Sequence, residues 1–353
     1  MENRKYSLDF LKIAAIIFIF FHHYQQYIGG IFEGGLNFYG GRFNFGLMVE
    51  LFFILSGFFV WPYVKKIHDG LTLKKFFLHK AKRLVPMLAI CAVGYEIVIV
   101  LYYVAFGHLE PFFDTTSLWE FFLSCTGLQK GWVFEGTPTI NYPVWYISIL
   151  LLCYLFFWIG TYICRKLHTS ARYFFVLMIM WGVAINSYDI NTAFMSHYNA
   201  RGYISFFTGV LLASYLYDAK INTKSALTAL LVVVFLGILY FVKPVCFEYR
   251  FEYILGFVFY PALIILFLTD TAGKIFSHKF WKEAADVAFH AFMWHYVGLI
   301  LMFTFMALCP GALERNSYTA MIIFAVLAFL MGLVSKVLTR PLFGKGKSVE
   351  KGN

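Results

Sequence analysis

Charged residues are scarce in this sequence. Only 14% of its 353 residues are Asp, Glu, Lys or Arg, against about 25% in a typical globular protein. Glycine and proline follow no period, which excludes collagen-like arrays, and the six cysteines show no metal-ligand spacing. Apolar residues are abundant instead: 61% are hydrophobic, 21% are aromatic, and the mean hydropathy is +0.71. This composition excludes a soluble domain and a disordered chain, and it predicts a polytopic membrane protein.

Several apolar stretches have about the length that a helix needs to cross a bilayer, roughly 20 residues. They are 8–28, 46–64, 85–106, 144–162, 172–188, 201–217, 226–243, 251–269, 288–308 and 318–338. The sequence therefore predicts an all-α domain of about ten transmembrane helices over residues 1–340, followed by a basic cytoplasmic tail, 341–353.

The positive charges determine the predicted orientation. The net charge is +10, which on a soluble fold would suggest nucleic acid, but here the excess follows the loops. Of the 29 Lys and Arg residues, 22 fall on the side that holds both termini and six on the other. Because cytoplasmic loops retain Lys and Arg, we expect both termini in the cytoplasm. The protein is then a multi-pass protein of the plasma membrane that binds no nucleic acid.

Polar residues inside the predicted spans are the first candidates for function, because a charge near the bilayer centre costs at least ~2.5 kcal/mol. They are Asp9, Lys12, His22, His23, Glu50, Ser56, Glu96, His290 and His295. Lys12 and His23 lie within roughly 20° of the same helix face and about 16 Å apart along the axis. We therefore expect Lys12 near the cytoplasmic interface and His23 in the outer half of the membrane.

His23 carries the chemical argument. A neutral imidazole accepts a proton near pH 7, because its unperturbed pKa is about 6.5. His23 is thus a candidate general base, and the alternative is a histidine that only hydrogen-bonds a neighbouring helix. His295, beside Trp294 in the ninth span, is a candidate supporting residue.

A dense basic cluster, Lys80, Lys82 and Arg83, precedes Pro86 in the predicted cytoplasmic loop before the third span. One interpretation is that these side chains only anchor the loop at lipid phosphates. The other is a site for a polyphosphorylated ligand, to which the planar guanidinium of Arg83 offers two hydrogen bonds at once.

The second span contains the stretch VELFFILSGFF, with Glu50, Ser56 and Gly57. The small residues Ser56 and Gly57 favour close helix packing. Glu50, near the outer end, could orient a histidine or a sugar hydroxyl, or be wetted by the interface. The outer loop 107–143 is acidic and aromatic, which suits carbohydrate and equally suits a loop lying on the membrane interface.

Taken in order, these segments resemble the acyltransferase 3 family of transmembrane acyltransferases. The stretch YSLDFLKIAAIIFIFFHHY resembles the family's opening, with Lys12 as its basic residue and His23 as its histidine. ELFFILSGFF is similar to its Phe-Phe-x-x-Ser-Gly-Phe motif, and KAKR is similar to its Arg-x-x-Arg element, with Lys80 and Arg83 in the basic positions. ISFFTGVLLASYL, residues 204–216, resembles its Phe-x-x-Gly segment, and AFHAFMWHY resembles its closing Ser-Tyr-x-x-Tyr-Leu-Trp-His segment.

Two positions depart from the family pattern. Trp145 is kept in the fourth span, but Leu150 stands where the family often has an acidic residue. Lys80 replaces an arginine, which keeps the charge and weakens planar recognition of phosphate. Many members also carry a soluble hydrolase-like domain after the last helix, whereas here we expect a stand-alone membrane domain.

The resemblance implies an O-acyltransferase. Such an enzyme moves an acyl group, commonly acetyl, from cytoplasmic acyl-coenzyme A to a hydroxyl of an extracytoplasmic or lipid-linked glycan. In this interpretation Lys80, Lys82 and Arg83 hold the phosphates of the donor. His23 removes the proton of the acceptor hydroxyl, and Lys12 belongs with it to the catalytic pair.

Lys12 is expected to steady the donor or to pair with Asp9, and a covalent acyl-enzyme on His23 or Ser56 is an alternative to direct transfer. The residues expected to contact substrate or support the site are Asp9, Glu50, Ser56, Trp145 and His295. The implied partners are acyl-coenzyme A, a glycan acceptor, the lipid bilayer and, as an open option, further copies of the chain. No metal is expected.

The rival function is a transporter or flippase of lipid-linked saccharides, which also uses many helices and polar residues within the membrane. Such proteins commonly have paired halves with interrupted helices, and no such repeat is visible in the sequence. A regulatory or scaffold protein without catalysis is a third option, which the presence of both His23 and Arg83 disfavours.

Overall fold

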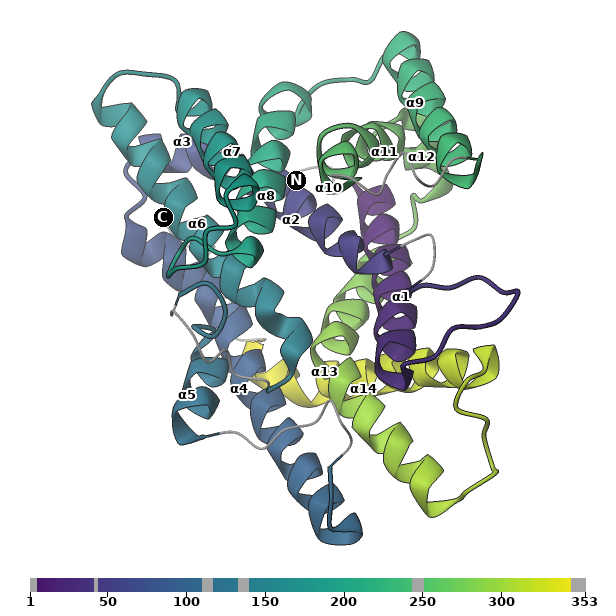
Figure 1. Ribbon diagram of the computed structural model, residues 1–353. Coiled ribbons are helices and arrows are strands. Elements are labelled where there is room, and N and C mark those ends of the chain that lie inside the picture. The colour runs from purple at the N-terminus through teal and green to yellow at the C-terminus, as the bar shows by residue number, and fades with distance from the viewer. Residues whose placement is uncertain (1–4, 41–43, 110–116, 133–139, 243–250, 344–353) are drawn as a thin grey trace.

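The computed structural model describes residues 5–40, 44–109, 117–132, 140–242 and 251–343. Over these ranges the chain is helical and forms no β-strand, so the all-α prediction is confirmed. The elements are α1 (Tyr6–Ile28), η1 (Phe45–Leu47), α2 (Met48–Val60), α3 (Tyr63–His68), α4 (Leu73–Phe106), α5 (Leu118–Thr126), η2 (Tyr142–Val144), α6 (Trp145–Lys166), α7 (Ala171–Ser187), α8 (His197–Leu216), α9 (Thr223–Val242), α10 (Phe251–Ile254), η4 (Leu255–Phe259), α11 (Tyr260–Phe267), α12 (Asp270–Ile275), α13 (Phe280–Leu308) and α14 (Tyr318–Phe343). In Figure 1, α4 to α7 lie on one side of the view and α9 to α12 on the other.

Among the described residues, five helices are long and apolar enough to cross a membrane: α1, α4, α6, α13 and α14. Shorter apolar helical stretches cover Phe45–Val60, Ala171–Ser187, Thr223–Leu239 and Leu255–Phe267. Each predicted span coincides with one helix or with a short run of helices. The count of ten crossings and the cytoplasmic termini stay predictions, and the predicted tail, 341–353, lies largely outside the described residues.

Helix α4 begins well before the predicted third span. The side chain of Thr72 caps it, and the helix continues through Pro86. The basic cluster therefore lies on a helix rather than in a loop. Because residues three apart on a helix point within about 60° of each other, Lys80 and Arg83 share a face from which Lys82 diverges.

Helices α2 and α8 meet backbone to backbone. A Cβ atom on Gly57 would overlap the carbonyl oxygen of Phe206, and one on Gly209 would overlap the carbonyl oxygen of Ile54. Glycine allows this approach because it has no Cβ, which confirms the packing interpretation of Gly57. The contact fixes the rotation of α2 about its axis and so the directions of its other side chains.

Helix α13 lies at the centre of the bundle, since it packs against α1, α4 and α14. Its residues His295 and Tyr296 are buried. They meet α1, where the ring of His23 lies 5.3 Å from that of His295 and the ring of Tyr27 lies 5.0 Å from that of Tyr296. The fold thus brings together the two helices that carry the candidate histidines.

Candidate active site

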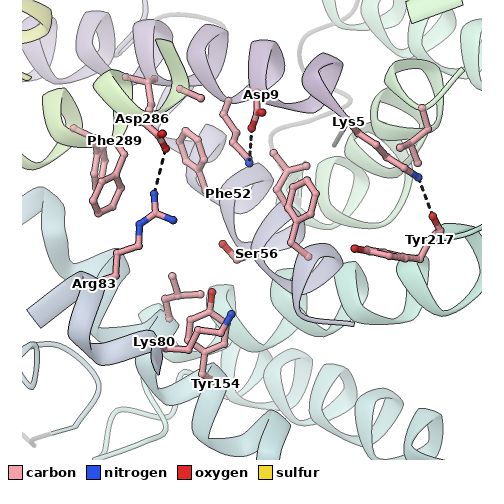
Figure 2. Close-up of a pocket in the computed structure, with 18 of the residues that line it drawn as sticks. Lys5, Asp9, Phe52, Ser56, Lys80, Arg83, Tyr154, Tyr217, Asp286 and Phe289 are labelled. Atoms are coloured by element: carbon pink, nitrogen blue, oxygen red, sulfur yellow. Dashed lines mark hydrogen bonds and ion pairs between the residues drawn. The ribbon is translucent and has the colours of Figure 1, made fainter. Parts of the chain in front are cut away.

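A pocket of about 1120 Å³ lies among α1, α2, α4, α6, α13 and the segment 217–221 that follows α8. Figure 2 shows Lys80 and Arg83 of α4 beside Ser56 of α2 in this pocket. The charged residues that line it are Lys5, Asp9, Lys12, Lys80, Arg83, Asp218, Lys220, Asp270 and Asp286. They come from the N-terminus and from segments that the distribution of Lys and Arg predicts to be cytoplasmic.

Two of the three basic residues predicted to bind the donor line this pocket. The Lys80 ammonium lies 4.9 Å from the ring centroid of Tyr154, a cation–π contact. Arg83 Nη2 lies 3.5 Å from Asp286 Oδ1, and its side chain is 66% exposed. Lys82 is exposed and does not line the pocket, as its position on the helix dictates. An anionic ligand could therefore replace Asp286 at Arg83 without breaking a buried ion pair.

The opposite wall carries cations that the sequence motifs do not reveal. Lys5 Nζ donates a hydrogen bond to the Tyr217 carbonyl oxygen at 2.9 Å (Figure 2), and Lys220 also lines this wall. Burial lowers the pKa of Lys5, and the nearby Asp218 carboxylate partly offsets this effect. The wall is assembled from the N-terminus and the end of α8, so no motif contains it.

Lys12 forms an ion pair with Asp9, which is one of the two roles expected for it. The Nζ–Oδ1 distance is 3.1 Å, the Asp9 side chain is only 3% exposed, and the ammonium lies 4.4 Å from the ring centroid of Phe59. The carboxylate offsets the charge of Lys12. This pair therefore adds less positive charge to the pocket than Lys80 and Arg83 do.

One wall of the pocket is an aromatic layer formed by Phe52, Tyr146 and Phe292. Their ring centroids lie 6.1 to 6.3 Å apart in each pairing. The hydroxyls of Ser56 and Tyr146 are hydrogen-bonded at 2.9 Å. Ser56 therefore lines the pocket and also links α2 to α6, whereas its neighbour Gly57 serves the contact with α8.

The two candidate imidazoles lie behind the aromatic layer. Phe292 stacks on His295 with ring centroids 5.5 Å apart, and His295 stacks on His23. His295 Nδ1 lies 2.6 Å from the Phe292 carbonyl oxygen, and His23 Nδ1 lies 3.0 Å from Gln26 Oε1. Because these oxygens only accept, each Nδ1 donates and each Nε2 keeps the lone pair of a neutral ring. His295 Nε2 has no hydrogen-bond partner among the residues that the structure describes.

Glu50 forms a buried ion pair that the sequence did not predict. Arg201 Nε and Nη2 donate to its two carboxylate oxygens at 2.5 and 3.0 Å. The guanidinium carbon also lies 4.9 Å from the ring centroid of Trp145. Arg201 belongs to α8 rather than to an outer loop. Glu50 is thus held by Arg201 instead of orienting a histidine or facing the interface.

The acidic and aromatic outer loop, 107–143, is only partly described. Three of its acids lie outside the described residues: Glu110, Asp114 and Glu135. Glu120 forms a capping box with Ser117 at the start of α5, and the indole N–H of Trp132 donates to the Ser148 carbonyl oxygen at 2.9 Å. Both side chains therefore have structural partners, and neither adds support for a carbohydrate surface.

Over the part of the chain that the structure describes, no group of three His, Cys, Asp or Glu side chains is placed to hold a metal ion. The cysteines of the same part are free thiols, and Cys246 lies outside it. The site therefore consists of cationic and acidic side chains, aromatic rings, the Ser56 hydroxyl and the two imidazoles behind the aromatic layer.

Comparison with known proteins gives one match. The acyltransferase 3 family, described as an acyltransferase domain, matches residues 5–340. No curated protein and no solved structure matches. The matched range includes every residue that lines the pocket. The chain, whose apolar helices indicate a membrane protein, therefore belongs to the acyltransferase 3 family.

Proposed function

We propose that this protein transfers an acyl group, most simply acetyl, from cytoplasmic acyl-coenzyme A to a hydroxyl of an extracytoplasmic or lipid-linked glycan at the plasma membrane. One observation carries the proposal. Phe292 lines the charged pocket and also stacks on His295, which in turn stacks on His23. An anionic donor in the pocket and a base at His23 would then be separated by the aromatic layer and the ring of His295.

The pocket suits a large anionic donor. Its volume of about 1120 Å³ exceeds the roughly 300–1,000 Å³ of most small-molecule pockets. Coenzyme A is a nucleotide with several phosphate charges and a slender pantetheine arm. In this proposal Lys80 and Arg83 on one wall, with Lys5 and Lys220 on the other, bind the phosphates, and the arm reaches the aromatic layer.

His23 is the proposed general base. Its Nε2 takes the proton of the acceptor hydroxyl as the hydroxyl oxygen attacks the carbonyl carbon of the thioester. The carbon–sulfur bond then breaks, the acceptor keeps the acyl group as an ester, and the proton passes from His23 to the leaving thiolate. His295 supports the reaction by packing between Phe292 and His23.

The purified protein in lipid nanodiscs, supplied with labelled acetyl-coenzyme A and de-esterified surface glycans, tests this function. We expect glycan esters to form with one thiol released per ester, and His23→Ala to lower the rate by about 10²–10⁴. His290→Ala is the matched control, because His290 bonds to Ser335 and does not line the pocket.

Undiminished transfer by His23→Ala would show that His23 is not the base. Movement of a lipid-linked saccharide across the bilayer without consumption of thioester would favour the transporter instead.

A further inference from the structure

Lys130 is a buried cation that the proposed reaction does not use. It lies between α5 and η2, on the predicted outer side, and only 8% of its surface is exposed. No carboxylate of the described residues pairs with it. Its Nζ instead lies 5.3 and 5.1 Å from the ring centroids of Tyr142 and Tyr198. A buried charge without a counter-ion is unusual, because nothing offsets its desolvation.

The residues that follow Lys130 are hydrogen-bonded to distant parts of the fold. The Gly131 carbonyl oxygen accepts the Phe194 N–H at 2.7 Å, and the indole of the next residue, Trp132, donates to the Ser148 carbonyl oxygen. Gly131 has φ +81°, a conformation that favours glycine. The backbone that carries Lys130 is therefore held in place, and its ammonium group lies between the rings of Tyr142 and Tyr198.

The rings around the Lys130 ammonium continue toward the proposed base. Tyr142 and Tyr198 are hydrogen-bonded through their hydroxyls. Tyr142 also lies close enough to Tyr27 for the two phenols to interact electrostatically. Tyr27 in turn stacks on His23, with ring centroids 6.0 Å apart. Tyr142 and Tyr27 therefore place Lys130 on the same side of the molecule as His23.

Among the residues that the structure describes, Glu50 neutralises Arg201 in this region, whereas no carboxylate pairs with Lys130. Burial lowers the pKa of Lys130 to about 8, so most of these side chains remain protonated at pH 7. An anion beside Nζ would replace the hydration that burial removes and would accept a charge-assisted hydrogen bond.

We propose that Lys130, together with Tyr142 and Tyr198, binds a negatively charged group of the acceptor, which is therefore an acidic glycan bearing carboxylate or phosphate. The inference rests on the proposed acyl transfer and narrows its acceptor. Carboxylate and phosphate present the same oxyanion chemistry to an ammonium group, and the experiment separates them.

The experiment uses glycans from cells that lack this protein, de-esterified with mild base and separated by anion exchange into neutral and acidic fractions. Each fraction is incubated with the purified protein and labelled acetyl-coenzyme A. The nanodiscs contain only zwitterionic lipid, so no anionic headgroup contributes. We expect label in the acidic fraction. Carboxyl reduction of one portion and mild hydrofluoric acid, which removes phosphate, on another identify the anion by the treatment that abolishes labelling.

Lys130→Gln should lower labelling of the acidic fraction by about tenfold or more at limiting acceptor, the effect of losing one hydrogen bond to a charged group. The KM for acetyl-coenzyme A should stay unchanged, and Lys130→Arg should retain most of the labelling. Because Lys130→Gln removes an unpaired buried charge, it should not lower the thermal unfolding midpoint.

Label confined to the neutral fraction overturns the inference, as does labelling of the acidic fraction that Lys130→Gln leaves unchanged. In both cases acyl transfer itself stands. Loss of labelling that accompanies a lowered unfolding midpoint also overturns it, because Lys130 would then have a structural role. Absence of label from both fractions refutes the acyl-transfer proposal instead.

Discussion

The pocket and the region around Arg201 hold their charges in opposite ways. Arg83, in the pocket, has a side chain that is 66% exposed and lies 3.5 Å from Asp286. Arg201 has a side chain that is 16% exposed and is bonded at 2.5 Å to Glu50. An exposed pair contributes only about 0–1 kcal/mol, whereas a buried pair resists disruption. The pocket is therefore suited to exchanging charged ligands, and the region around Arg201 to keeping one arrangement.

The largest predicted effect comes from breaking the buried ion pair between Glu50 and Arg201. Glu50→Gln leaves the Arg201 guanidinium buried without a counter-charge, which should destabilise the protein by about 3–5 kcal/mol. The measurement is the thermal unfolding midpoint of the purified protein. Asp286→Asn, which removes the exposed partner of Arg83, is the control and should cost less than about 1 kcal/mol. Equal shifts of the unfolding midpoint in the two variants would show that the two ion pairs do not differ in their contribution to stability.

The next largest effect concerns Arg83, the exposed cation of the pocket. Arg83→Ala should raise the KM for acetyl-coenzyme A by about 10- to 100-fold, because it removes hydrogen bonds to a charged group worth about 1.5–3 kcal/mol. The KM for the acceptor should not change. Lys82→Ala removes an equal charge from the same helix but from outside the pocket, and it should leave both constants unchanged. Similar effects of the two variants would favour simple membrane anchoring by the cluster.

The smallest effect lies at the aromatic layer, which forms one wall of the pocket. Ser56→Ala removes the hydrogen bond to Tyr146, which is worth about 0.5–1.5 kcal/mol, so transfer should fall by less than about tenfold. An acyl-enzyme on Ser56 would instead require the hydroxyl, and its loss would abolish transfer. Mass spectrometry of the intact protein after a donor pulse provides the second readout, and an acyl adduct that Ser56→Ala removes would establish the covalent route.

Helix geometry explains what the sequence could predict. The sequence predicts that Lys12 and His23 lie on one face of a helix, and this geometry applies only if the helix is continuous. Helix α1 runs without a break through both residues. The basic cluster was recognisable, but which of its members face the pocket depends on where α4 begins. Helix α4 begins after its cap, Thr72. The apolar stretch that predicts the third span begins only at residue 85, so it does not show where the helix starts. The sequence alone therefore predicts one donor-binding cluster that includes both Lys80 and Lys82, although their side chains point in different directions from α4.

Contacts between distant helices account for what the sequence missed. Glu50 and Arg201 are separated by 151 positions, and Lys5 and Tyr217 by 212. Apolar periodicity and charge counts show that helices exist and on which side their ends lie, but not which helices are neighbours. For the same reason the motifs indicate His295 as a supporting residue but do not show that its ring stacks on that of His23.

The backbone contact between α2 and α8 has a mechanical consequence. Gly57 and Gly209 clamp the two helices at one level, and the Glu50–Arg201 ion pair ties them again at another. Two contacts at different levels restrict sliding and axial rotation of either helix relative to the other. Phe52 lies between Glu50 and Gly57 on α2, so a shift of this helix would move the pocket wall and the Glu50–Arg201 ion pair together.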